Sequence, residues 1–332
     1  MGGRGIRRIV PGLLAAALLS AACSDAESGL DGTSEPSGAS PKGTGSPSPA
    51  PGVVAVVEAG QRPCAMTEAL GSVWVTSYAE GTLVRIDPAT NEAVERFDVG
   101  GQACGVAFAA GSLWVGLLGP GTLARVDPDS GEVVDEIDLG GDAWDVQAGG
   151  RLVWVANRGV GSVWAVDART GRVVTKVDDL STPAGLAVTK DAVWVADALR
   201  ATVLRIDPRN GEVVAEIAFD GETPTWFAAD ADGVWVTLVG EDQVARIDPE
   251  TNRVVARVDV GAMPLDPGIA GGHVWVPNRD DGTVSRIDPT GDEVVATLPL
   301  EVGVFVAEPA AGDIWLLDFD GSAVTRIDPD AA

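Results

Sequence analysis

Hydrophobic residues recur along this chain in a pattern that repeats about every 40 residues. Each repeat holds an apolar stretch around a tryptophan, a glycine-bearing turn and a second apolar stretch that ends in aspartate, as in Gly111 to Pro128, GSLWVGLLGPGTLARVDP. The aspartate follows the tryptophan by thirteen residues in all repeats. The tryptophans are Trp74, Trp114, Trp154, Trp194, Trp235, Trp275 and Trp315, and the aspartates are Asp87, Asp127, Asp167, Asp207, Asp248, Asp288 and Asp328. Two markers that stay in phase predict a repeat architecture.

Each repeat contains four short segments that are typical of β-strands. In the second repeat these are ACGVAFA, SLWVGL, TLARVDP and EVVDEIDL, and they are separated by turn residues. Sheets of four strands repeated seven times predict an all-β fold, a seven-bladed β-propeller over residues 53–332. The tryptophans are expected in its core, and the Asp-Pro pairs are expected to form tight turns, because proline fixes φ and aspartate accepts backbone hydrogen bonds.

The two ends of the repeat region predict how the ring closes. The last repeat ends at AVTRIDPDAA and lacks its fourth strand, whereas the segment Val53 to Cys64 aligns in phase with Ala93 to Cys104, which includes a fourth strand. We therefore expect the N-terminal strand to complete the last blade. Such closure removes the open edges that a linear array of sheets would leave.

The N-terminal 52 residues predict export and a tether. Residues 1–23 begin with arginines, continue through an apolar run and end in LLSAAC, which indicates a lipoprotein-type signal peptide with Cys23 as the lipidated residue. An ordinary signal peptide cut near Ala22 is the alternative. Residues 24–52 are rich in Ser, Gly and Pro and are expected to be a disordered tether, with a reach of roughly 30 Å. The predicted location is extracytoplasmic, at the cell membrane.

The amino-acid composition argues against several classes of function. The 23 basic and 49 acidic residues give a net charge of -26, which argues against nucleic acid and against anionic lipid surfaces as partners. One histidine and three cysteines leave little material for a transition-metal site or for histidine acid-base chemistry. We therefore expect no cofactor and no metal, and a binding function is favoured over an enzymatic one.

The repeats SVWVTSYAEGTLVRIDPATNEAV and HVWVPNRDDGTVSRIDPTGDEVVAT resemble those of the YVTN (YncE-like) bacterial β-propeller family over residues 53–332. They are more distantly similar to the propellers of the virginiamycin B lyase group. The first resemblance implies the fold and leaves the activity open. The second implies a metal-dependent lyase with a His/Glu centre, whereas this chain offers only His273, which is expected on the side opposite the usual binding funnel.

A candidate ligand site is expected where the innermost strands begin and the tryptophan strands end, because propeller geometry brings these positions to one face. There the repeats differ from one another, and divergent polar and aromatic side chains are free to serve a ligand. The candidate residues are Trp144, Asp145, Arg158, Trp226, Asp266 and Arg279. Indole faces, carboxylates and guanidinium groups together suit a small polar ligand with an apolar body.

Cys64 and Cys104 occupy equivalent positions in adjacent repeats and are a possible disulfide pair in an oxidising compartment. Whether the innermost strands approach closely enough for a bond is left open by the sequence.

The sequence thus predicts a non-catalytic binding or interaction module of the cell envelope, expected to be a monomer. Its partner would be an unknown small polar ligand or an envelope protein. A lyase-like enzyme and a protein-protein scaffold are the alternatives.

Overall fold

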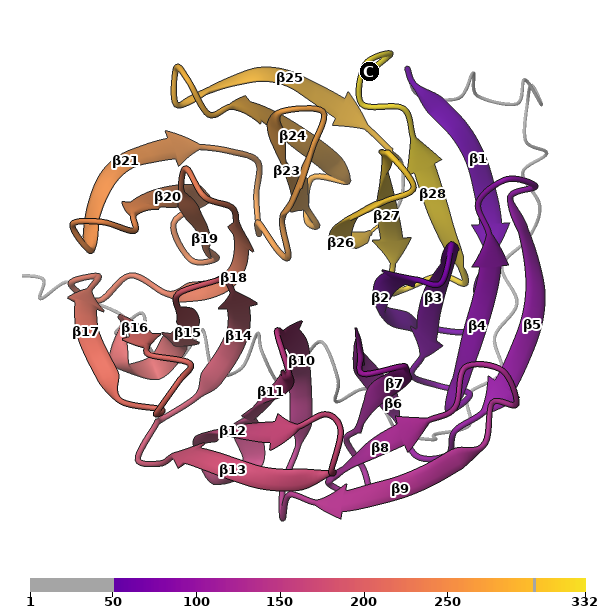
Figure 1. The fold of residues 1–332 in the computed structure, drawn as a ribbon. Coiled ribbons are helices and arrows are strands. Elements are labelled where there is room, and N and C mark those ends of the chain that lie inside the picture. The colour runs from indigo at the N-terminus through magenta and orange to yellow at the C-terminus, as the bar shows by residue number, and fades with distance from the viewer. Residues whose placement is uncertain (1–50, 301–302) are drawn as a thin grey trace, which may run out of the picture.

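The computed structural model describes residues 51–300 and 303–332, which form seven four-stranded antiparallel sheets around one axis (Figure 1). We number these sheets as blades 1 to 7 in the order of their innermost strands. The seven-bladed β-propeller that the repeat predicts is confirmed.

The strands of each blade are given from the innermost to the outermost. Blade 1 contains β2 (Pro63–Ala69), β3 (Ser72–Ser77), β4 (Thr82–Asp87) and β5 (Glu92–Asp98), and blade 2 contains β6 (Ala103–Ala109), β7 (Ser112–Leu117), β8 (Thr122–Val126) and β9 (Val133–Asp138). Blade 3 contains β10 (Ala143–Gly149), β11 (Leu152–Asn157), β12 (Ser162–Asp167) and β13 (Arg172–Val177), and blade 4 contains β14 (Pro183–Val188), β15 (Val193–Asp197), β16 (Thr202–Ile206) and β17 (Val213–Ala218). Blade 5 contains β18 (Pro224–Ala229), β19 (Val234–Leu238), β20 (Gln243–Asp248) and β21 (Arg253–Asp259), and blade 6 contains β22 (Gly268–Ala270), β23 (His273–Asn278), β24 (Thr283–Asp288) and β25 (Glu293–Pro299). Blade 7 contains β26 (Val304–Ala310), β27 (Asp313–Asp318), β28 (Ala323–Ile327) and β1 (Val53–Glu58), and two 3-10 turns, η1 (Arg158–Val160) and η2 (Ala198–Arg200), follow the second strands of blades 3 and 4.

The second strand of each blade carries the repeat tryptophan into the core. All seven of these tryptophans are at most 1% exposed. The outermost strands are more open, and in β13 exposed and half-buried residues alternate. Burying one indole removes about 200 Å² of surface from water, which is worth about 5 kcal/mol before entropy is counted. The tryptophans are therefore packing residues, as the sequence predicts.

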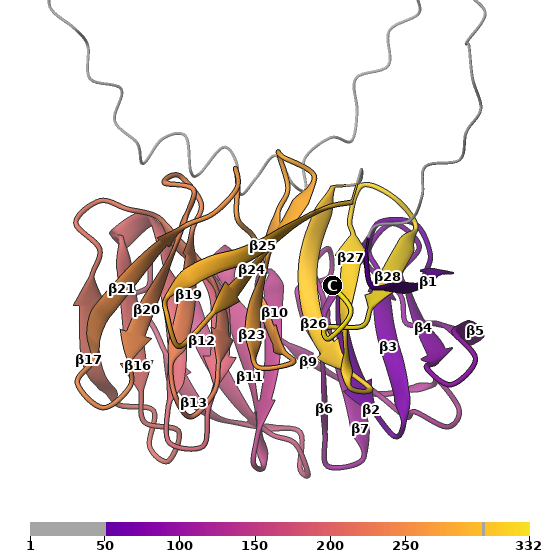
Figure 2. The ribbon, with the colours of Figure 1, turned by 90° about the horizontal axis from the view of Figure 1, so that it is seen from above.

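All innermost strands run in the same direction along the axis, so the loops divide into two groups, one at each end of the disc (Figure 2). The loops that lead into the innermost strands and the loops that follow the tryptophan strands share one end, which we call the funnel face. In blade 3 the two kinds of loop meet there, because the Arg158 N–H donates to the Asp142 carbonyl at 3.0 Å. The hairpin turns after the innermost strands and the Asp-Pro turns share the other end, the turn face.

Aspartate side chains hold the Asp-Pro turns together. Asp127 Oδ1 accepts hydrogen bonds from the backbone N–H groups of Ser130 (2.9 Å) and Asp129 (3.0 Å). These bonds lower the pKa of the Asp127 carboxyl group, because they favour its charged form. This is the structural role that the sequence predicts for these residues.

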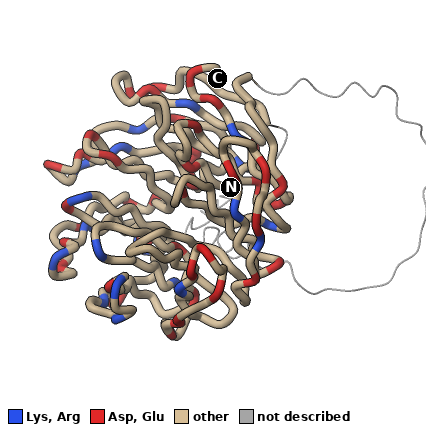
Figure 3. Tube along the Cα trace, turned by 45° about the vertical axis from the view of Figure 1, so that its right-hand side comes forward, with Lys and Arg blue, Asp and Glu red and all other residues tan. Residues whose placement is uncertain are grey.

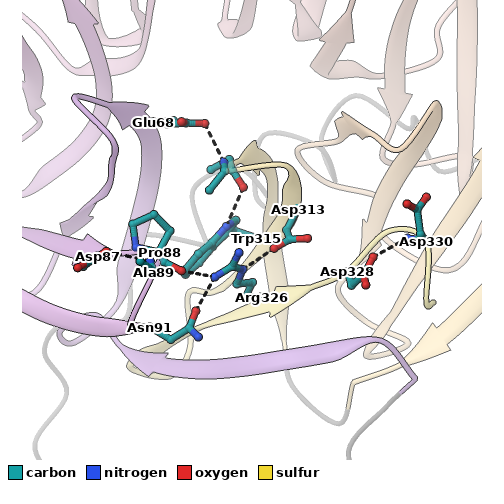
Figure 4. Close-up of polar contacts among 12 residues, drawn as sticks. Glu68, Asp87, Pro88, Ala89, Asn91, Asp313, Trp315, Arg326, Asp328 and Asp330 are labelled. Atoms are coloured by element: carbon teal, nitrogen blue, oxygen red, sulfur yellow. Dashed lines mark hydrogen bonds and ion pairs between the residues drawn. The ribbon is translucent and has the colours of Figure 1, made fainter.

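An arginine eleven residues after the tryptophan connects some blades to the next one, and we call this contact the interblade clasp. In blade 7, the Arg326 guanidinium lies 5.4 Å from the centre of the Trp315 ring. It donates to Asp313 in its own blade and reaches across to the Pro88 carbonyl and to Asn91 Oδ1 in blade 1 (Figure 4). The same clasp toward the Asp-Pro turn of the next blade is made by Arg205, Arg246 and Arg286.

The clasp is absent where the turn ends in glycine. The position of Asn91 is occupied by Gly131, Gly171 and Gly211 in blades 2, 3 and 4. A Cβ atom on Gly131 would lie 1.9 Å from the Phe97 ring, so this turn packs directly against the preceding blade. Arg125 of blade 2 instead donates its Nε–H to Ser112 of its own blade at 2.9 Å. The ring is therefore clasped from blade 4 through blade 7 to blade 1, and unclasped from blade 1 to blade 4.

The N-terminal strand closes the ring, as predicted. β1 pairs antiparallel with β28, with Val56 opposite Thr325, and the two strands lie side by side in Figure 1. On the turn face, the Glu68 carboxylate accepts a hydrogen bond from the Ala311 N–H at 2.8 Å, which adds a second link between blades 1 and 7.

The innermost strand of blade 6 is shorter than the repeat predicts. β22 contains only three residues, because Pro264 and Pro267 have no N–H group to donate to the neighbouring strand. Asp266, between the two prolines, instead forms a parallel bridge with Val306 of blade 7. This difference brings the backbone of blade 6 onto the next blade near the axis.

Acidic residues outnumber basic residues in the chain and are spread around the disc (Figure 3). Within residues 51–300 and 303–332, no helix is long and apolar enough to cross a membrane. The predicted signal peptide with Cys23, and the predicted tether up to residue 50, lie outside the described residues.

Candidate functional site

The axis of the propeller is filled by aromatic side chains at the funnel face. Trp144 of β10 and Trp226 of β18 have their ring centres 6.1 Å apart, and Trp226 lies 5.8 Å from Phe305 of β26. Phe305 contacts Phe319 at 5.3 Å, and Phe319 contacts Tyr78 at 6.0 Å. We call these five residues the aromatic plug. Trp144 is 3% exposed and Trp226 is 5% exposed, so their ring faces contact other side chains and not an open funnel.

Arginines cover the plug on two sides. The Arg158 guanidinium lies 3.8 Å from the centre of the Trp144 ring, and the Arg62 guanidinium lies 4.6 Å from the centre of the Phe319 ring. Such cation-π contacts are worth about 0.5–1 kcal/mol at exposed sites. Arg279, by contrast, donates to Asp320 at 2.7 Å and takes part in an ion pair between blades 6 and 7. The structure thus brings Arg158 to the two tryptophans and gives Arg279 a different partner.

A disulfide borders the plug. Cys64 and Cys104 are bonded, with their Cα atoms 4.9 Å apart, which places blades 1 and 2 in covalent contact. The close approach has a local cause, because the Thr76 hydroxyl donates to the Cys104 carbonyl at 2.7 Å and draws the innermost strands together.

Two predicted aspartates lie below the plug, between innermost strands. Asp145 Oδ2 accepts a hydrogen bond from the Leu186 N–H at 2.7 Å, and its Oδ1 accepts one from Gln147 Nε2 at 3.3 Å. Burial nevertheless raises the pKa of Asp145 to about 6. Burial also raises the pKa of Asp266 well above its usual range, and the negative charges of Asp145 and Glu308 add to this effect. Both residues are held near the axis by strand backbone.

Glu308 is a third carboxyl group of this cluster. Burial raises its pKa to about 8, with further contributions from the charges of Asp145 and Glu68. At neutral pH the Glu308 carboxyl group is therefore protonated for much of the time and is able to donate a hydrogen bond. Both line a cavity of about 360 Å³ beside the innermost strands, together with Gln147 and Phe227. Its chemistry suits a polar, uncharged group.

The single histidine lies on the turn face. His273 begins β23, and its Nδ1 is 2.9 Å from the Gly271 carbonyl in the adjacent hairpin turn. It is therefore separated from the plug by the length of the blade. Within residues 51–300 and 303–332, no three His, Cys, Asp or Glu side chains are placed to hold a metal ion.

Sequence reasoning therefore named part of this cluster of side chains. It named Trp144, Trp226, Asp145, Asp266 and Arg158, and the structure places all five at or just below the plug. It did not commit to Phe305, Phe319, Arg62 and Glu308. Phe305 gave a usable signal, because it occupies the same repeat position as Trp144. Ligand binding by these residues stays a prediction.

Comparison with protein-family models found a match to a family of envelope proteins. The sequence model of the family described as outer membrane protein assembly factor BamB matches residues 79–225. This is fewer than half of the residues. No curated protein sequence matches the chain.

Many solved structures share the fold at low identity. A streptogramin B lyase is 15% identical with a TM-score of 0.71, over 83% of this chain and 95% of that one. Virginiamycin B lyase from Staphylococcus aureus is 12% identical with a TM-score of 0.70, over 82% of this chain and 98% of that one. BamB from Moraxella catarrhalis is 13% identical with a TM-score of 0.63, over 83% of this chain and 99% of that one. At such identity the likeness concerns the fold.

Proposed function

We propose that this protein is a non-catalytic, protein-binding propeller of the cell envelope, anchored to the membrane by a lipid on Cys23. The match to the BamB family over residues 79–225 supports an envelope role. The lipoprotein-type signal and the polar tether in the sequence support the anchor.

The observation that carries the proposal is the funnel face of blades 3 and 4. The 3-10 turns η1 and η2 present Val160, which is 50% exposed, and Leu199, which is 44% exposed. Arg158 and Arg200 lie in the same two turns. Because the plug fills the adjacent end of the axis, a partner meets the two aliphatic side chains there, with Arg158 and the Arg200–Asp197 ion pair beside them. Such a surface suits a protein segment with apolar and acidic residues.

The test replaces the two exposed aliphatic residues. A Val160→Asp/Leu199→Asp variant should lose its envelope partner in crosslinking of intact cells, because it places charge in the apolar contact. The matched control is Val214→Asp/Val255→Asp, which changes two valines on outermost strands that are each 54% exposed. The proposal fails if both variants crosslink like the wild type, or if both lose the partner equally.

A lyase-like activity is the second candidate, because two lyases share the fold. It is checked by a streptogramin-linearisation assay on the purified protein with and without divalent metal ions. Metal-dependent turnover would contradict the non-catalytic proposal.

The anchor is tested independently of the binding surface. Mass spectrometry of the mature N-terminus should find a diacylated or triacylated Cys23. A chain that begins near residue 23 without lipid would remove the anchor from the proposal and leave the binding surface in place.

A further inference from the structure

A cavity of about 550 Å³ lies on the turn face beside blade 4. It is lined by the hairpin turn after β14, by Trp194 and Arg205 of the same blade, and by residues of the blade-5 turns around Asp230 and Pro249. We call it the blade-4 cavity. It is remote from the funnel face and does not belong to the surface discussed above.

Two buried donors on residues that line this cavity have no hydrogen-bond partner in the described part of the chain. They are the indole Nε1–H of Trp194 and the Nε–H of Arg205. Trp194 is fully buried, and the Nη1 of Arg205 is already used by the clasp to the Pro249 carbonyl at 2.8 Å. A buried donor without an acceptor costs about 1–3 kcal/mol, so two at one place require an explanation.

The equivalent donors are satisfied in other blades. In blade 1, the Trp74 Nε1–H donates to the Ala69 carbonyl at 3.1 Å, and the Arg85 Nε–H donates to the Ser72 hydroxyl at 2.9 Å. Blade 2 repeats this arrangement with Trp114, Ala109, Arg125 and Ser112.

In blade 7 the equivalent arginine is paired with a carboxylate group. Its Arg326 Nε–H donates to the carboxylate of Asp313, which occupies the repeat position of Ser72. The Trp315 Nε1–H donates to the Ala310 carbonyl at 3.1 Å. A carboxylate at this position is thus accommodated by the same fold.

The sequence of blade 4 explains why both donors lack acceptors. Ala192 replaces the serine or aspartate and has no acceptor in its side chain. The hairpin turn also differs in its backbone, because the Thr189 N–H donates to the Ala192 carbonyl at 2.9 Å across Lys190 and Asp191. In blade 1 the turn residues Leu70 and Gly71 both have positive φ, whereas Lys190 and Asp191 do not.

Blades 3 and 6 each have one of the two buried donors without a partner. In blade 6 the Arg286 Nε–H lacks a partner, but the Trp275 Nε1–H donates to the Ala270 carbonyl at 3.0 Å. In blade 3 the Trp154 Nε1–H lacks a partner, but Ala165 stands where the arginine would be. Among the described residues, both donors are buried without a partner together only in blade 4, and in blade 5, where Gly233 stands at the serine position, the Arg246 guanidinium bonds through Nη1 and Nη2.

Charged side chains of both signs line the cavity: Lys190 and Arg205 are basic, and Asp191, Asp230 and Glu250 are acidic. Lys190 in the hairpin turn is exposed and has no ion-pair partner among the described residues. Of the acidic lining residues, Asp230 uses Oδ1 to accept the Asp232 and Gly233 N–H groups, and the charge of Asp191 interacts with Arg209. Glu250 is exposed and lies at the blade-5 turn.

We propose that the blade-4 cavity binds a carboxylate, which takes the place that the Asp313 side chain occupies in blade 7. One carboxylate oxygen accepts from the Arg205 Nε–H and from the Trp194 Nε1–H, and Lys190 contributes an ammonium group at the opening. The carboxylate belongs either to a small organic acid or to an acidic side chain of a peptide.

The experiment follows the indole and guanidinium N–H signals of the ¹⁵N-labelled mature chain by nuclear magnetic resonance. The probes are N-acetylglycine, as a free carboxylate, and acetyl-Gly-Asp-Gly-amide, as an acidic side chain in a peptide. We expect saturable shifts of the Trp194 and Arg205 signals with at least one probe. The Trp114 signal, whose donor is already bonded to Ala109, is the internal control. The stronger probe identifies the source of the carboxylate.

Variants at Ala192 test the mechanism. Ala192→Asp supplies an internal carboxylate, as Asp313 does in blade 7, and should weaken probe binding at least tenfold, because it removes a charge-assisted hydrogen bond from the ligand. Ala192→Ser places the hydroxyl group of Ser72 and Ser112 at this position and should weaken probe binding less. It provides a second, milder test in case Ala192→Asp does not fold. Lys190→Gln should weaken binding about threefold or more while the protein stays folded.

Three results would overturn the proposal. The first is no shift of the Trp194 and Arg205 signals at 20 mM of either probe. The second is an equal shift with chloride, which would show a response to any anion. The third is unchanged affinity in both folded Ala192 variants, which would place the carboxylate elsewhere.

Discussion

Trp226 stands at the centre of the aromatic plug, because its ring contacts both Trp144 and Phe305. It is 5% exposed, so removal of its side chain leaves a cavity. We expect Trp226→Ala to lower the free energy of unfolding by about 3–5 kcal/mol, as measured by denaturant titration. Val214→Ala, on an exposed strand position, should change it by less than about 0.5 kcal/mol.

A Trp226→Ala variant with unchanged stability would contradict the packing role of this side chain. If Trp226→Ala keeps its stability while a polar ligand no longer binds, the ring serves the ligand and the plug opens in solution. The packing interpretation would then be wrong.

Glu308 should make stability depend on pH between about 4.5 and 8. Its pKa is raised to about 8 in the folded protein, so over this range the folded state binds more protons than the unfolded state. The free energy of unfolding should therefore fall as the pH rises through this window. Thermal melting at pH 6 and pH 8 should show a higher melting temperature at pH 6, and Glu308→Gln should reduce the difference.

The exposed Glu250 provides a control for this measurement. Glu250→Gln should leave the pH profile of the wild type in place. An unchanged profile in Glu308→Gln would show that other groups, such as Asp145, produce the dependence.

At single positions, the sequence predicted which residues depart from the repeat but not how they contact one another. Trp144 and Trp226 are separated by 82 positions, and only the ring brings them together. The raised pKa of Glu308 depends on burial and on Asp145 of another blade, which no local pattern encodes.

The arginines over the repeat tryptophans are of two kinds: some bond to the next blade through an interblade clasp, and others bond only within their own blade. Arg326→Met keeps an apolar stem over Trp315 but removes hydrogen bonds to blade 1 and leaves Asp313 without its partner. We expect a loss of about 2–3 kcal/mol in the free energy of unfolding. Arg125→Met is the matched variant, because Arg125 also lies over a tryptophan but bonds only within its blade, and it should cost about 1 kcal/mol. Equal losses would contradict the clasp.

The disulfide joins two blades and is checked by thiol labelling. Cys64 and Cys104 should not react in the denatured, unreduced protein and should both react after reduction. Two reactive thiols before reduction would show that the bond does not form.

At the scale of strands, periodicity predicted the order and number of the sheets because packing of the tryptophans imposes it. It failed for β22, where prolines at 264 and 267 interrupt the strand. It also missed η1 and η2, since three-residue 3-10 turns leave no periodic signal.

Closure of the whole ring depends on β1. Deletion of residues 53–58 would leave β28 as an exposed edge, which should promote aggregation and lower the melting temperature. The control is deletion of residues 24–50, which should leave the melting temperature of the propeller unchanged. Equal melting temperatures for the two deletions would contradict closure by this strand.

The uneven distribution of the clasps has a mechanical consequence. The place where the two ends of the propeller meet is fastened by β1 and by Arg326, and a covalent bond ties the next interface. The seam therefore carries the most cross-links, whereas the interfaces from blade 2 to blade 4 carry neither a clasp nor a disulfide in the described part of the chain. The turns with Val160 and Leu199 fall in this unclasped arc, whereas the blade-4 cavity lies at the clasped interface between blades 4 and 5. Deformation of the disc is therefore expected first between blades 2 and 4, where packing, the continuous chain and the hydrogen bond from Leu186 to Asp145 hold neighbouring blades together.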